Sequence, residues 1–493
     1  MAAQRRASPD QIRFILNGNV VSVDAIAPTQ TVLGYLRETL GRPGTKEGCA
    51  EGDCGACTVV IGELCDGQVV MKPVNSCIQF LPTLDGKALF TVEDLRRKDG
   101  SLHPVQQAMV DCHGSQCGFC TPGFVMSLWS LYLASNAAEC RPDEREIRSA
   151  LTGNLCRCTG YRPIIEAGGK MFDLPKVAFD RDALRTSLFA IKRETTLTIE
   201  HAGQHFFAPK SLPALLQLRA TYPKATILAG STDIGLWVNK QFRDLGDIIF
   251  IGEVAGLKVI RKTESSLTIG AGVSLSDAYE ALRPVYPEMN EMWERFASVP
   301  IRNAGTLGGN IANGSPIGDS MPALIALRAS VTLASVLGTR TLPLEDLYLA
   351  YMKNAIAADE LLTAVDIPLP VAAISFRTYK VSKRFDSDIS AVCAAFACRI
   401  DGARIVDARV AYGGMAATPK RAAATEAALT GQRWDETTVR AAMAALATDY
   451  APLSDMRAGS EYRLSTAQNL LYRFYLETRT VDALSAADVS VFA

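Results

Sequence analysis

Hydrophobic and polar residues alternate over the stretch 12–23 at the start of the chain, and Asn17-Gly18 interrupts the alternation. A period of two predicts half-buried strands, and Asn-Gly between two such runs predicts a tight hairpin. A short helical pattern, a loop rich in Gly and Cys at 48–57 and a second hairpin follow. The pattern therefore predicts a compact α+β unit over residues 1–95.

From residue 96 onward the pattern becomes helical. Four prolines stand where a helix would begin, namely Pro104, Pro122, Pro142 and Pro163. Proline is tolerated in the first turn of a helix, so we expect a small bundle of four helices over 96–172. Residues 173–195 carry scattered charge without a clear period, and they are expected to form a linker.

The rest of the chain divides at residue 375. Short apolar runs alternate with helical patterns over 196–375, and two Gly-rich loops interrupt them. Longer apolar runs precede Ala-rich helices over 376–493. The strand candidates are 226–228, 248–251, 267–269 and 331–333 in the first part, and 394–400 and 405–412 in the second. Each part is therefore expected to be an α+β domain.

Composition places the chain among ordinary globular proteins. Of its 493 residues, 48% are hydrophobic and 21% are charged, and its length corresponds to about three domains. The formal net charge is −1, which gives no electrostatic support for binding nucleic acid or an anionic membrane. No apolar run is long enough to span a membrane, and no apolar stretch follows Arg5-Arg6 as an export signal requires. We therefore expect a cytoplasmic protein without a membrane partner.

Cysteines are concentrated near the N-terminus, where 11 of the 13 lie within the first 158 residues. Thiols stay reduced in the cytosol, so a dense group of cysteines favours metal ligands over disulfides. Cys49, Cys54 and Cys57 have the spacing C-x4-C-x2-C, and 19 residues separate Cys57 from Cys77. This is the spacing of plant-type [2Fe–2S] ligands. The sequence therefore predicts an iron–sulfur cluster at these four cysteines.

The loop around the first cysteine set also fits a cluster. Three glycines are expected to supply the positive φ angles that a loop wrapped around a cluster needs, namely Gly48, Gly52 and Gly55. Zinc sites usually carry two C-x2-C pairs, and only Cys54 and Cys57 form such a pair here. Zinc is therefore the weaker interpretation for this set.

A second set consists of Cys117 and Cys120 in a C-x2-C pair and Cys156 and Cys158 in a C-x-C pair. Each pair stands just before a predicted helix start, where the positive end of the helix dipole favours a negative cluster. Two such pairs can converge on one metal centre, and their spacing alone leaves zinc open. Five other cysteines fit neither set and are interpreted as ordinary thiols: Cys65, Cys112, Cys140, Cys393 and Cys398. His113 is interpreted as a structural residue.

The two Gly-rich segments have a chemistry of their own. The first, 229–235, follows a strand and offers backbone N–H groups as a nest for a pyrophosphate, with hydroxyls from Ser231 and Thr232. In the second, Gly305, Gly308 and Gly309 would let the backbone approach the same ligand closely. Asn310, Asn313 and Asp319 can bond phosphate or ribose. The chain has no G-x-G-x-x-G and no Walker A motif, so it is neither a Rossmann nor a P-loop site.

Five segments resemble the xanthine dehydrogenase family. They are 48–59, 114–123 (GSQCGFCTPG), 153–164 (GNLCRCTGYRPI), 227–235 (ILAGSTDIG) and 304–319 (AGTLGGNIANGSPIGD). The resemblance covers essentially the whole chain and implies a multidomain α+β protein. Its parts, in order, would be a β-grasp plant-type ferredoxin domain, a four-helix [2Fe–2S] domain, a non-Rossmann FAD-binding domain and a C-terminal flavoprotein domain. The second cysteine set would then hold a second [2Fe–2S] cluster.

The resemblance also implies the FAD contacts. They are Ile227, Leu228, Ala229, Gly230, Ser231, Thr232, Asp233, Ile234, Phe296, Thr306, Gly309, Asn310, Asn313, Asp319, Leu362 and Lys380. Phe296 stands where the family has an aromatic residue against the isoalloxazine, and Lys380 matches a lysine that contacts the flavin. Asn313 replaces a threonine that is common in the family. Three charged residues after Lys380 either tune the flavin or form a solvated turn: Arg384, Asp386 and Asp388.

The family's reaction implies a role for this chain and a partner for it. The chain ends at Ala493, soon after the flavoprotein part, so we expect molybdopterin and the hydroxylation site on a separate large subunit, with two copies of each subunit. The resemblance therefore implies that the chain is similar to the small iron–sulfur/FAD subunit of a two-subunit bacterial xanthine dehydrogenase. Electrons from hypoxanthine or xanthine would pass from molybdenum through the helical-domain cluster and the plant-type cluster to FAD, and then to NAD+. No side chain of this chain need act as a base for hydroxylation.

Three other interpretations stay open from the sequence. An aldehyde or N-heterocycle hydroxylase would use the same cofactors with another substrate and another acceptor. A non-catalytic electron carrier or redox sensor would have no need of an FAD domain. A zinc-stabilised interaction protein would be colourless.

Overall fold

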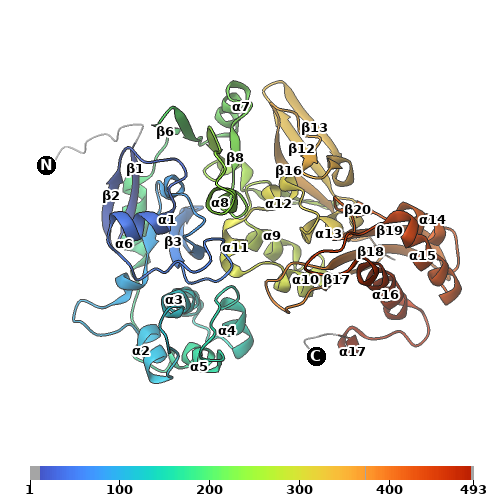
Figure 1. The fold of residues 1–493 in the computed structure, drawn as a ribbon, viewed down its shortest axis with the longest axis horizontal. Helices are drawn as coiled ribbons and strands as arrows, with labels where there is room; N and C mark the ends of the chain where they lie inside the picture. Colours follow the sequence, from blue (N-terminus) through green and yellow to red (C-terminus); the bar gives the residue numbers. More distant parts are fainter. Residues whose placement is uncertain (1–10, 372–373, 490–493) are drawn as a thin grey trace. The chain divides into compact units, whose positions relative to one another are not determined.

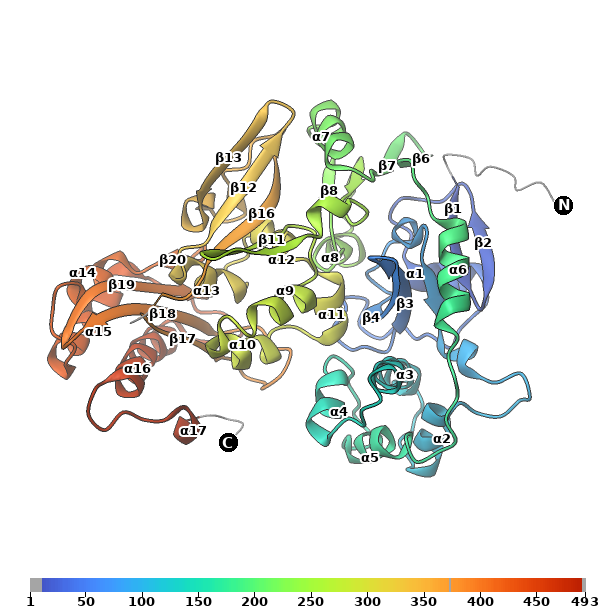
Figure 2. The same cartoon turned by 180° about the vertical axis from the view of Figure 1, so that it is seen from behind.

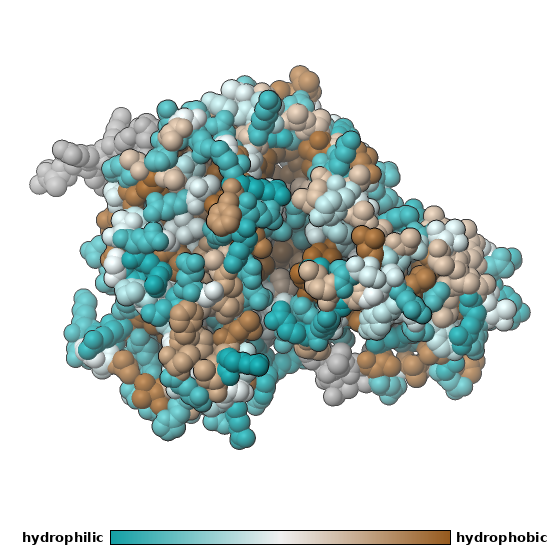
Figure 3. All heavy atoms as spheres, in the orientation of Figure 1, coloured by the Kyte–Doolittle hydropathy of each residue, from teal (hydrophilic) through white to brown (hydrophobic). Residues whose placement is uncertain are grey.

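The computed structural model describes residues 11–371 and 374–489. They divide into two compact units that do not follow the order of the chain. The first unit holds residues up to 255 together with 274–276 and 298–306, and the second holds 256–273, 277–297 and the residues from 307 onward. None of the helices in the described residues is both long and apolar enough to cross a membrane. Hydrophilic and hydrophobic residues are interspersed over the face shown in Figure 3.

The first unit begins with a five-stranded sheet in the order β2-β1-β5-β3-β4 (Figure 1). Its strands are β1 (Ile12–Leu16), β2 (Asn19–Val23), β3 (Thr58–Cys65), β4 (Gln68–Asn75) and β5 (Ala88–Phe90). The predicted hairpins at Asn17-Gly18 and Asp66-Gly67 are confirmed, with Asn17 and Asp66 at positive φ. Between the hairpins lie α1 (Val32–Gly34) and the π-helical turn η1 (Tyr35–Thr39), and the 3-10 turns η2 (Leu81–Leu84) and η3 (Val92–Leu95) flank β5.

The helical part of the first unit contains the four predicted helices. They are α2 (Pro104–Asp111), α3 (Thr121–Ala138), α4 (Glu144–Ala150) and α5 (Arg162–Lys170). The central helix α3 is apolar on all sides because it is buried by its neighbours: Phe124 and Leu128 pack with Ile147 of α4 and Ile164 of α5. Val60 of β3 belongs to the same core, which fixes the helical part against the sheet.

Part of the predicted linker over 173–195 is helical. It contains α6 (Arg181–Ile191), which lies alongside the first sheet (Figure 2). Leu184, Leu188 and Ile191 are buried against the sheet, while Asp182, Thr186 and Phe189 are exposed. The spacing of four and three residues is a helical period, but it is too short to stand out among the charges.

A second sheet in the first unit has the order β6-β7-β9-β8. Its elements are β6 (Leu197–His201), β7 (Gln204–Ala208), β8 (Thr226–Leu228) and β9 (Ile248–Phe250), with α7 (Leu212–Thr221), α8 (Ile234–Asn239) and α11 (Val299–Ala304). One hydrophobic core joins both sheets, because Phe14 and Leu36 belong to the same buried cluster as Phe206 and Ile248. The part that carries the first cysteine set is therefore continuous with the part that carries the first Gly-rich segment.

The second unit contains two main sheets, in the orders β10-β11-β16-β12-β13 and β17-β18-β19-β20, and a small hairpin, β14-β15. Its strands are β10 (Ile260–Lys262), β11 (Ser266–Gly270), β12 (Ser330–Ser335), β13 (Gly338–Pro343), β14 (Tyr348–Ala350), β15 (Lys353–Asn354), β16 (Leu361–Pro368), β17 (Ile374–Val381), β18 (Val392–Asp401), β19 (Arg404–Gly413) and β20 (Lys420–Arg421). Its helices are α9 (Leu275–Leu282), α10 (Asn290–Arg295), α12 (Leu307–Asn313), α13 (Ser320–Ala326), α14 (Ala423–Leu429), α15 (Glu436–Asp449), α16 (Ser460–Thr478) and α17 (Ala486–Val489). Three 3-10 turns complete the fold: η4 (Ala255–Leu257), η5 (Pro287–Met289) and η6 (Leu344–Leu347). Together with β8 and β9, these strands confirm the strands predicted within residues 196–375 and 376–493.

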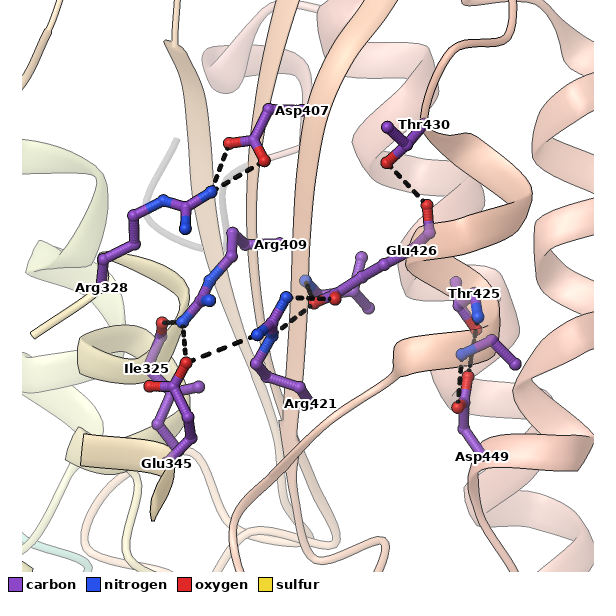
Figure 4. Close-up of polar contacts among 12 residues, drawn as sticks. Ile325, Arg328, Glu345, Asp407, Arg409, Arg421, Thr425, Glu426, Thr430 and Asp449 are labelled. Carbon is purple, nitrogen blue, oxygen red and sulfur yellow. Dashed lines mark hydrogen bonds and ion pairs between the residues drawn. The ribbon is translucent and has the colours of Figure 1, made fainter. Parts of the chain in front are cut away.

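A network of charged side chains joins the last sheet of the second unit to α13, η6 and α14 (Figure 4). Arg409 of β19 donates to the carbonyl of Ile325 at 2.6 Å and to the Glu345 carboxylate at 2.7 Å. Arg421 of β20 pairs with Glu426 of α14 at 2.6 Å and lies 3.5 Å from Glu345. Burial lowers the pKa of the Arg409 guanidinium, and the Glu345 carboxylate opposes that shift. The network therefore fixes the C-terminal end of α13 to the last sheet.

Candidate functional site

The first cysteine set converges at one end of the β3–β4 hairpin. Cys57 precedes β3 and Cys77 follows β4, and the strands hold these ends together because Thr58 pairs with Asn75. Side-chain hydrogen bonds join Cys49 to Cys54 and to Cys77. They lower the pKa of the Cys49 thiol and raise the pKa of Cys54 and Cys77, and another such bond joins Cys57 to Cys77. The four sulfurs thus lie within hydrogen-bonding reach of one another.

Backbone N–H groups of the loop point at the first sulfur. The Cys49 Sγ accepts from the N–H of Glu51 at 3.4 Å and of Cys54 at 3.3 Å. Donors of this kind stabilise a negative cluster. The loop achieves this with two positive φ angles at glycine, +80° at Gly52 and +68° at Gly55.

Gly48 has a different role from the one predicted, because its φ is not positive. A Cβ at this position would lie 2.9 Å from the Cys54 Sγ, so glycine is needed there for space. The third residue with a positive φ in the loop is Ala50, at 55°. Spacing alone could not distinguish these two uses of a small residue.

The second cysteine set lies where two helices begin. α3 starts directly after Cys120, and α5 starts four residues after Cys158. Burial and a hydrogen bond with Cys156 raise the pKa of the Cys120 thiol to about 12. A hydrogen bond with Cys117 raises the pKa of Cys158. The structure therefore brings all four cysteines of this set together as well.

The two sets differ in their exposure to solvent. Cys57 and Cys77 are buried, whereas Cys117 and Cys158 are exposed. Three large apolar or aromatic side chains beside the second set are also exposed, namely Phe119 (47%), Leu155 (40%) and Tyr161 (37%). The first set thus lies deeper in the unit than the second.

The two sets are in direct contact through the backbone. The N–H of Leu155 donates to the carbonyl of Cys54 at 3.0 Å. The neighbouring Asn154 is buried, donates to the carbonyl of Gly55 at 3.1 Å and accepts from Ser127 at 2.6 Å. A Cβ on Gly123 at the start of α3 would collide with the Gly55 carbonyl. The contact therefore depends on glycine at position 123.

Four cysteines that hold a two-iron cluster are arranged differently from ligands that share a single metal ion. Within residues 11–371 and 374–489, no three His, Cys, Asp or Glu side chains are placed to hold one metal ion. A [2Fe–2S] cluster takes four cysteines over two irons. Each set offers four converging thiols, which is the donor number such a cluster needs.

The first Gly-rich segment lies in the first unit, between β8 and α8. Residues 227–228 end the strand, 229–233 turn, and Ile234 begins the helix. Ser231 has a φ of 63°, and its buried Oγ has no hydrogen-bond partner among the described residues. A buried hydroxyl that lacks a partner fits a polar ligand at this turn. Gly230 packs so closely on the backbone of Ala304 that a Cβ would collide with it.

The expectation of a loop over the second Gly-rich segment is wrong for residues 307–313, which form α12. Gly308 lets this helix approach the backbone beyond β11, where a Cβ would lie 2.6 Å from the oxygen of Ala271. Tertiary packing thus overrides the low helix propensity of glycine. The Oδ1 of Asn310 on this helix is buried and has no partner in the described part of the chain. It is the second polar atom that fits a ligand.

Asp319 and Lys380 form a buried ion pair in the second unit. The Lys380 Nζ lies 2.6 Å from the Asp319 carboxylate, and each side chain is only 1% exposed. Lys380 also donates to the Asp388 carbonyl and to the Ser390 hydroxyl, both at 2.7 Å. The Ser390 hydroxyl donates in turn to Asp319 at 2.7 Å. The lysine expected to contact flavin thus places its ammonium on three protein oxygens.

The other predicted flavin residues lie at several positions. Thr306 is in the first unit, where it forms an isolated bridge with Ser274. Phe296 ends α10, and its ring centroid is 6.2 Å from that of Tyr279. Leu362 is buried on β16 and Asn313 ends α12. Gly309 lies on α12, and Arg384 and Asp388 lie in a turn after β17, where the Arg384 N–H donates to the Asp388 carboxylate at 2.8 Å.

The cysteines outside the two sets are spread over the fold. Cys65 and Cys140 are exposed, Cys112 is half-buried, and Cys393 and Cys398 are buried. Burial raises the pKa of the Cys398 thiol to about 12 and that of Cys393 well above its usual value. None of the five lies in either set.

His103 has a structural role that the sequence pattern did not reveal. His103 is buried and caps α2: its Nδ1 accepts from the N–H of Val105 at 3.3 Å, while the Gln106 side chain bonds the His103 backbone. Burial, followed by the charge of Arg97, lowers the pKa of this imidazole to about 4. Its place just before Pro104 was the available signal, because helix caps precede a proline at the first helical position.

Four domain families match the chain in order. A 2Fe-2S iron-sulfur cluster binding domain matches residues 14–78, and a [2Fe-2S] binding domain matches 91–168. An FAD binding domain in molybdopterin dehydrogenase matches 200–370, and a CO dehydrogenase flavoprotein C-terminal domain matches 377–478. In this order and combination, the matches are those of the iron–sulfur and FAD-binding part of a molybdenum hydroxylase. The predicted fold class is therefore confirmed.

Whole proteins and solved structures of this family are similar to the chain. Xanthine dehydrogenase of Oryza sativa is 30% identical over 96% of the chain, which covers 40% of that protein. Carbon monoxide dehydrogenase from Hydrogenophaga pseudoflava matches 54% of the chain and 94% of its own aligned chain, with a TM-score of 0.52 and 27% identity. Quinoline 2-oxidoreductase from Pseudomonas putida 86 matches 56% of the chain and 97% of its own, with a TM-score of 0.51 and 27% identity. The chain thus spans 40% of the length of its xanthine dehydrogenase relative.

Proposed function

We propose that this chain carries electrons between a molybdopterin-binding partner and NAD+ in the oxidation of hypoxanthine or xanthine to urate. The observation that carries this proposal is a continuous series of contacts in the first unit. The second cysteine set bonds to the first through Leu155 and Cys54. The first set bonds to the flavin segment through Gln79, whose Nε2 donates to the Gly230 carbonyl at 2.9 Å. Centres held at these places would lie in the order that an electron relay needs.

The side chains have simple tasks in this proposal. When bound, the clusters supply one-electron steps and FAD supplies the exchange between one-electron steps and a hydride. Cys49, Cys54, Cys57 and Cys77 would hold one cluster as thiolates. Cys117, Cys120, Cys156 and Cys158 would hold the other. The protein buries two cysteines of the first set and exposes two of the second, which suits delivery of electrons from a partner to the second set.

The FAD contacts follow from the family and from two unsatisfied atoms. In the first unit we propose residues 227–234 and Thr306, with Ser231 as a donor to the ligand. In the second unit we propose Phe296, Gly309, Asn310, Asn313, Asp319, Leu362 and Lys380. The domain limits 1–95, 96–172, 196–375 and 376–493 are proposed from the resemblance to the family. α6 occupies most of the connection between the second and third of these domains.

The partner is proposed to be a separate large subunit that binds molybdopterin, in a complex with two copies of each chain. The solved carbon monoxide dehydrogenase shows that parts of such an enzyme can lie on separate chains, because nearly all of one of its chains aligns with about half of this one. Thiols stay reduced in the cytosol, so the dense group of cysteines supports a cytoplasmic location.

Purification of the complex through a tag on this chain tests the proposal. The preparation is expected to contain iron, FAD and molybdenum, and to reduce NAD+ when xanthine is added. Iron and FAD without a molybdenum-containing partner would contradict the proposed partner. A complex that contains molybdenum but leaves xanthine unchanged would contradict the proposed substrate.

A second candidate is an aldehyde or N-heterocycle hydroxylase with another acceptor. It is favoured by the solved structure of quinoline 2-oxidoreductase, which resembles this chain as closely as the structure of carbon monoxide dehydrogenase does. Activity with quinoline or an aldehyde and an artificial acceptor, and none with xanthine and NAD+, would select this candidate.

A further inference from the structure

The segment Cys77–Gln79 is bonded at one end to the first flavin segment and at the other end to the last residue of α8, the helix that follows this segment. At one end, Gln79 is 8% exposed and donates to the Gly230 carbonyl at 2.9 Å. At the other end, the half-buried Asn239 donates through its Nδ2 to the Cys77 carbonyl at 2.8 Å. Both bonds lie within the first unit.

Asn239 also reaches the start of the cysteine loop. The same Nδ2 donates to the carbonyl of Ala50 at 3.0 Å. Ala50 follows Cys49, and Cys77 is the last cysteine of the set, so one amide joins both ends of the first set. Because a side-chain amide has two N–H groups, Asn239 can satisfy both carbonyls at once.

The helix that carries Asn239 is packed directly on the cysteine segment. α8 begins in the flavin segment, and Gly235 on this helix donates its N–H to the Ser231 carbonyl at 2.8 Å. A Cβ at Gly235 would lie 2.7 Å from the Cβ of Ile78. The helix therefore cannot move away from Ile78 without disturbing both Ser231 and Asn239.

We propose that Asn239 is a positioning residue that sets the reduction potential of the plant-type cluster and couples it to the flavin segment. The inference rests on the proposed function, because it assumes a cluster at Cys49, Cys54, Cys57 and Cys77. Hydrogen-bonding partners beyond the ligands tune a bound cluster. The Asn239 amide places the positive ends of two N–H dipoles on two carbonyls, that of Ala50 in the cysteine loop and that of Cys77 after β4. Without them, the uncompensated carbonyl dipoles make the site more negative, so the cluster accepts an electron less readily.

The test is a redox titration of Asn239→Leu, followed by paramagnetic resonance of both clusters. Cys54→Ser and Cys117→Ser assign each signal to its cysteine set. Asn239→Leu is expected to lower the reduction potential of the first cluster alone. The equilibrium constant for electron transfer between the two clusters is expected to change about tenfold, which corresponds to about 59 mV for a one-electron couple. Asn239→Asp, which keeps the shape and adds a charge, is expected to shift the same cluster further in the same direction.

Asn136→Leu is the matched control. Asn136 is also half-buried and donates its Nδ2 to a backbone carbonyl, that of Tyr132 on α3, at 2.9 Å. It is expected to shift neither potential. Selective loss of the first cluster in Asn239→Leu also supports the proposal. If Asn239→Leu loses both clusters, the potentials measured in Asn239→Asp decide the outcome. Unchanged potentials, or an equal shift of both, overturn the inference, while a wild-type protein without two clusters and FAD overturns the proposed function instead.

Discussion

The backbone N–H of Leu155 donates a hydrogen bond to the carbonyl oxygen of Cys54 over 3.0 Å. Leu155 precedes Cys156, so this bond joins a residue of the first cysteine set to the neighbour of a residue of the second. Asn154 and Gly55, which are 99 residues apart in the chain, are bonded beside it. The segments that carry the two cysteine sets are therefore joined directly through their backbones, and a change at one set is expected to reach the other through this contact.

Replacement of Cys117 by serine is expected to separate the two half-reactions of the complex. The second cysteine set would lose a ligand, so xanthine-driven NAD+ reduction is expected to stop. Transfer of electrons from NADH to a dye through FAD is expected to remain. Cys140→Ser is the control, because Cys140 is exposed and belongs to neither set. Loss of both activities in Cys117→Ser with FAD still bound would contradict the proposed order of the relay.

Gly123→Ala is expected to disturb both cysteine sets. The added Cβ collides with the carbonyl of Gly55 and lies 3.1 Å from the Asn154 Nδ2. Overpacking of this kind costs about 1–3 kcal/mol, and a lower iron content per chain is expected. Gly169→Ala on α5 is the control, because nothing lies within 4 Å of its Cβ and alanine favours a helix by about 1 kcal/mol. Thermal unfolding and iron analysis of the two variants would test this, and equal behaviour would count against the proposed contact.

Lys380→Met is expected to weaken the second unit and its hold on FAD. It leaves the carboxylate of Asp319 buried without its ammonium partner, which costs about 3–5 kcal/mol when a buried pair is broken. Lower FAD content with unchanged iron content is expected, measured after gel filtration. Lys383→Met provides the comparison, because Lys383 is nearby in the sequence and its ammonium bonds only an exposed carbonyl, that of Met456. FAD content equal to wild type in Lys380→Met would remove Lys380 from the proposed flavin site.

The cap residue His103 is expected to make stability depend on pH. Its pKa is about 4 in the folded protein, below the ordinary value near 6.5, so the unfolded chain binds more protons between these values. Stability from this group is therefore complete above pH 6.5 and is lost as the pH falls toward 4, by roughly 2–3 kcal/mol. His103→Asn keeps a cap that does not titrate, so it is expected to lose less stability than wild type between pH 7.5 and 5 in urea unfolding. Parallel losses in the two proteins would refute this role.

The sequence predicted the features that depend on short stretches of chain. Both hairpins follow from turn residues between alternating runs, and α2, α3 and α5 each have proline in the first turn. The two cysteine sets were singled out from spacing alone, because their members come from two short loops each. Such features need no knowledge of tertiary packing.

The features that the sequence did not reveal arise between distant segments. Leu155 meets Cys54, and Asn239 meets Cys77, only because α3 packs on the first sheet and α8 packs on Ile78. The helix α12 forms across a Gly-rich motif because Gly308 has to fit against Ala271. No local pattern carries these contacts, since each depends on a residue far away in the chain.

An anaerobic titration of the purified chain with NADH, followed by visible absorbance and paramagnetic resonance, tests whether FAD and both clusters form one electron relay. We expect NADH to bleach the flavin band first and then the bands of both iron–sulfur clusters, because the flavin segment, the first cysteine set and the second are bonded in series. A flavin that NADH reduces while both clusters stay oxidised would contradict the relay within this chain. A protein that binds both cofactors and is not bleached at all would contradict NAD+ as the acceptor.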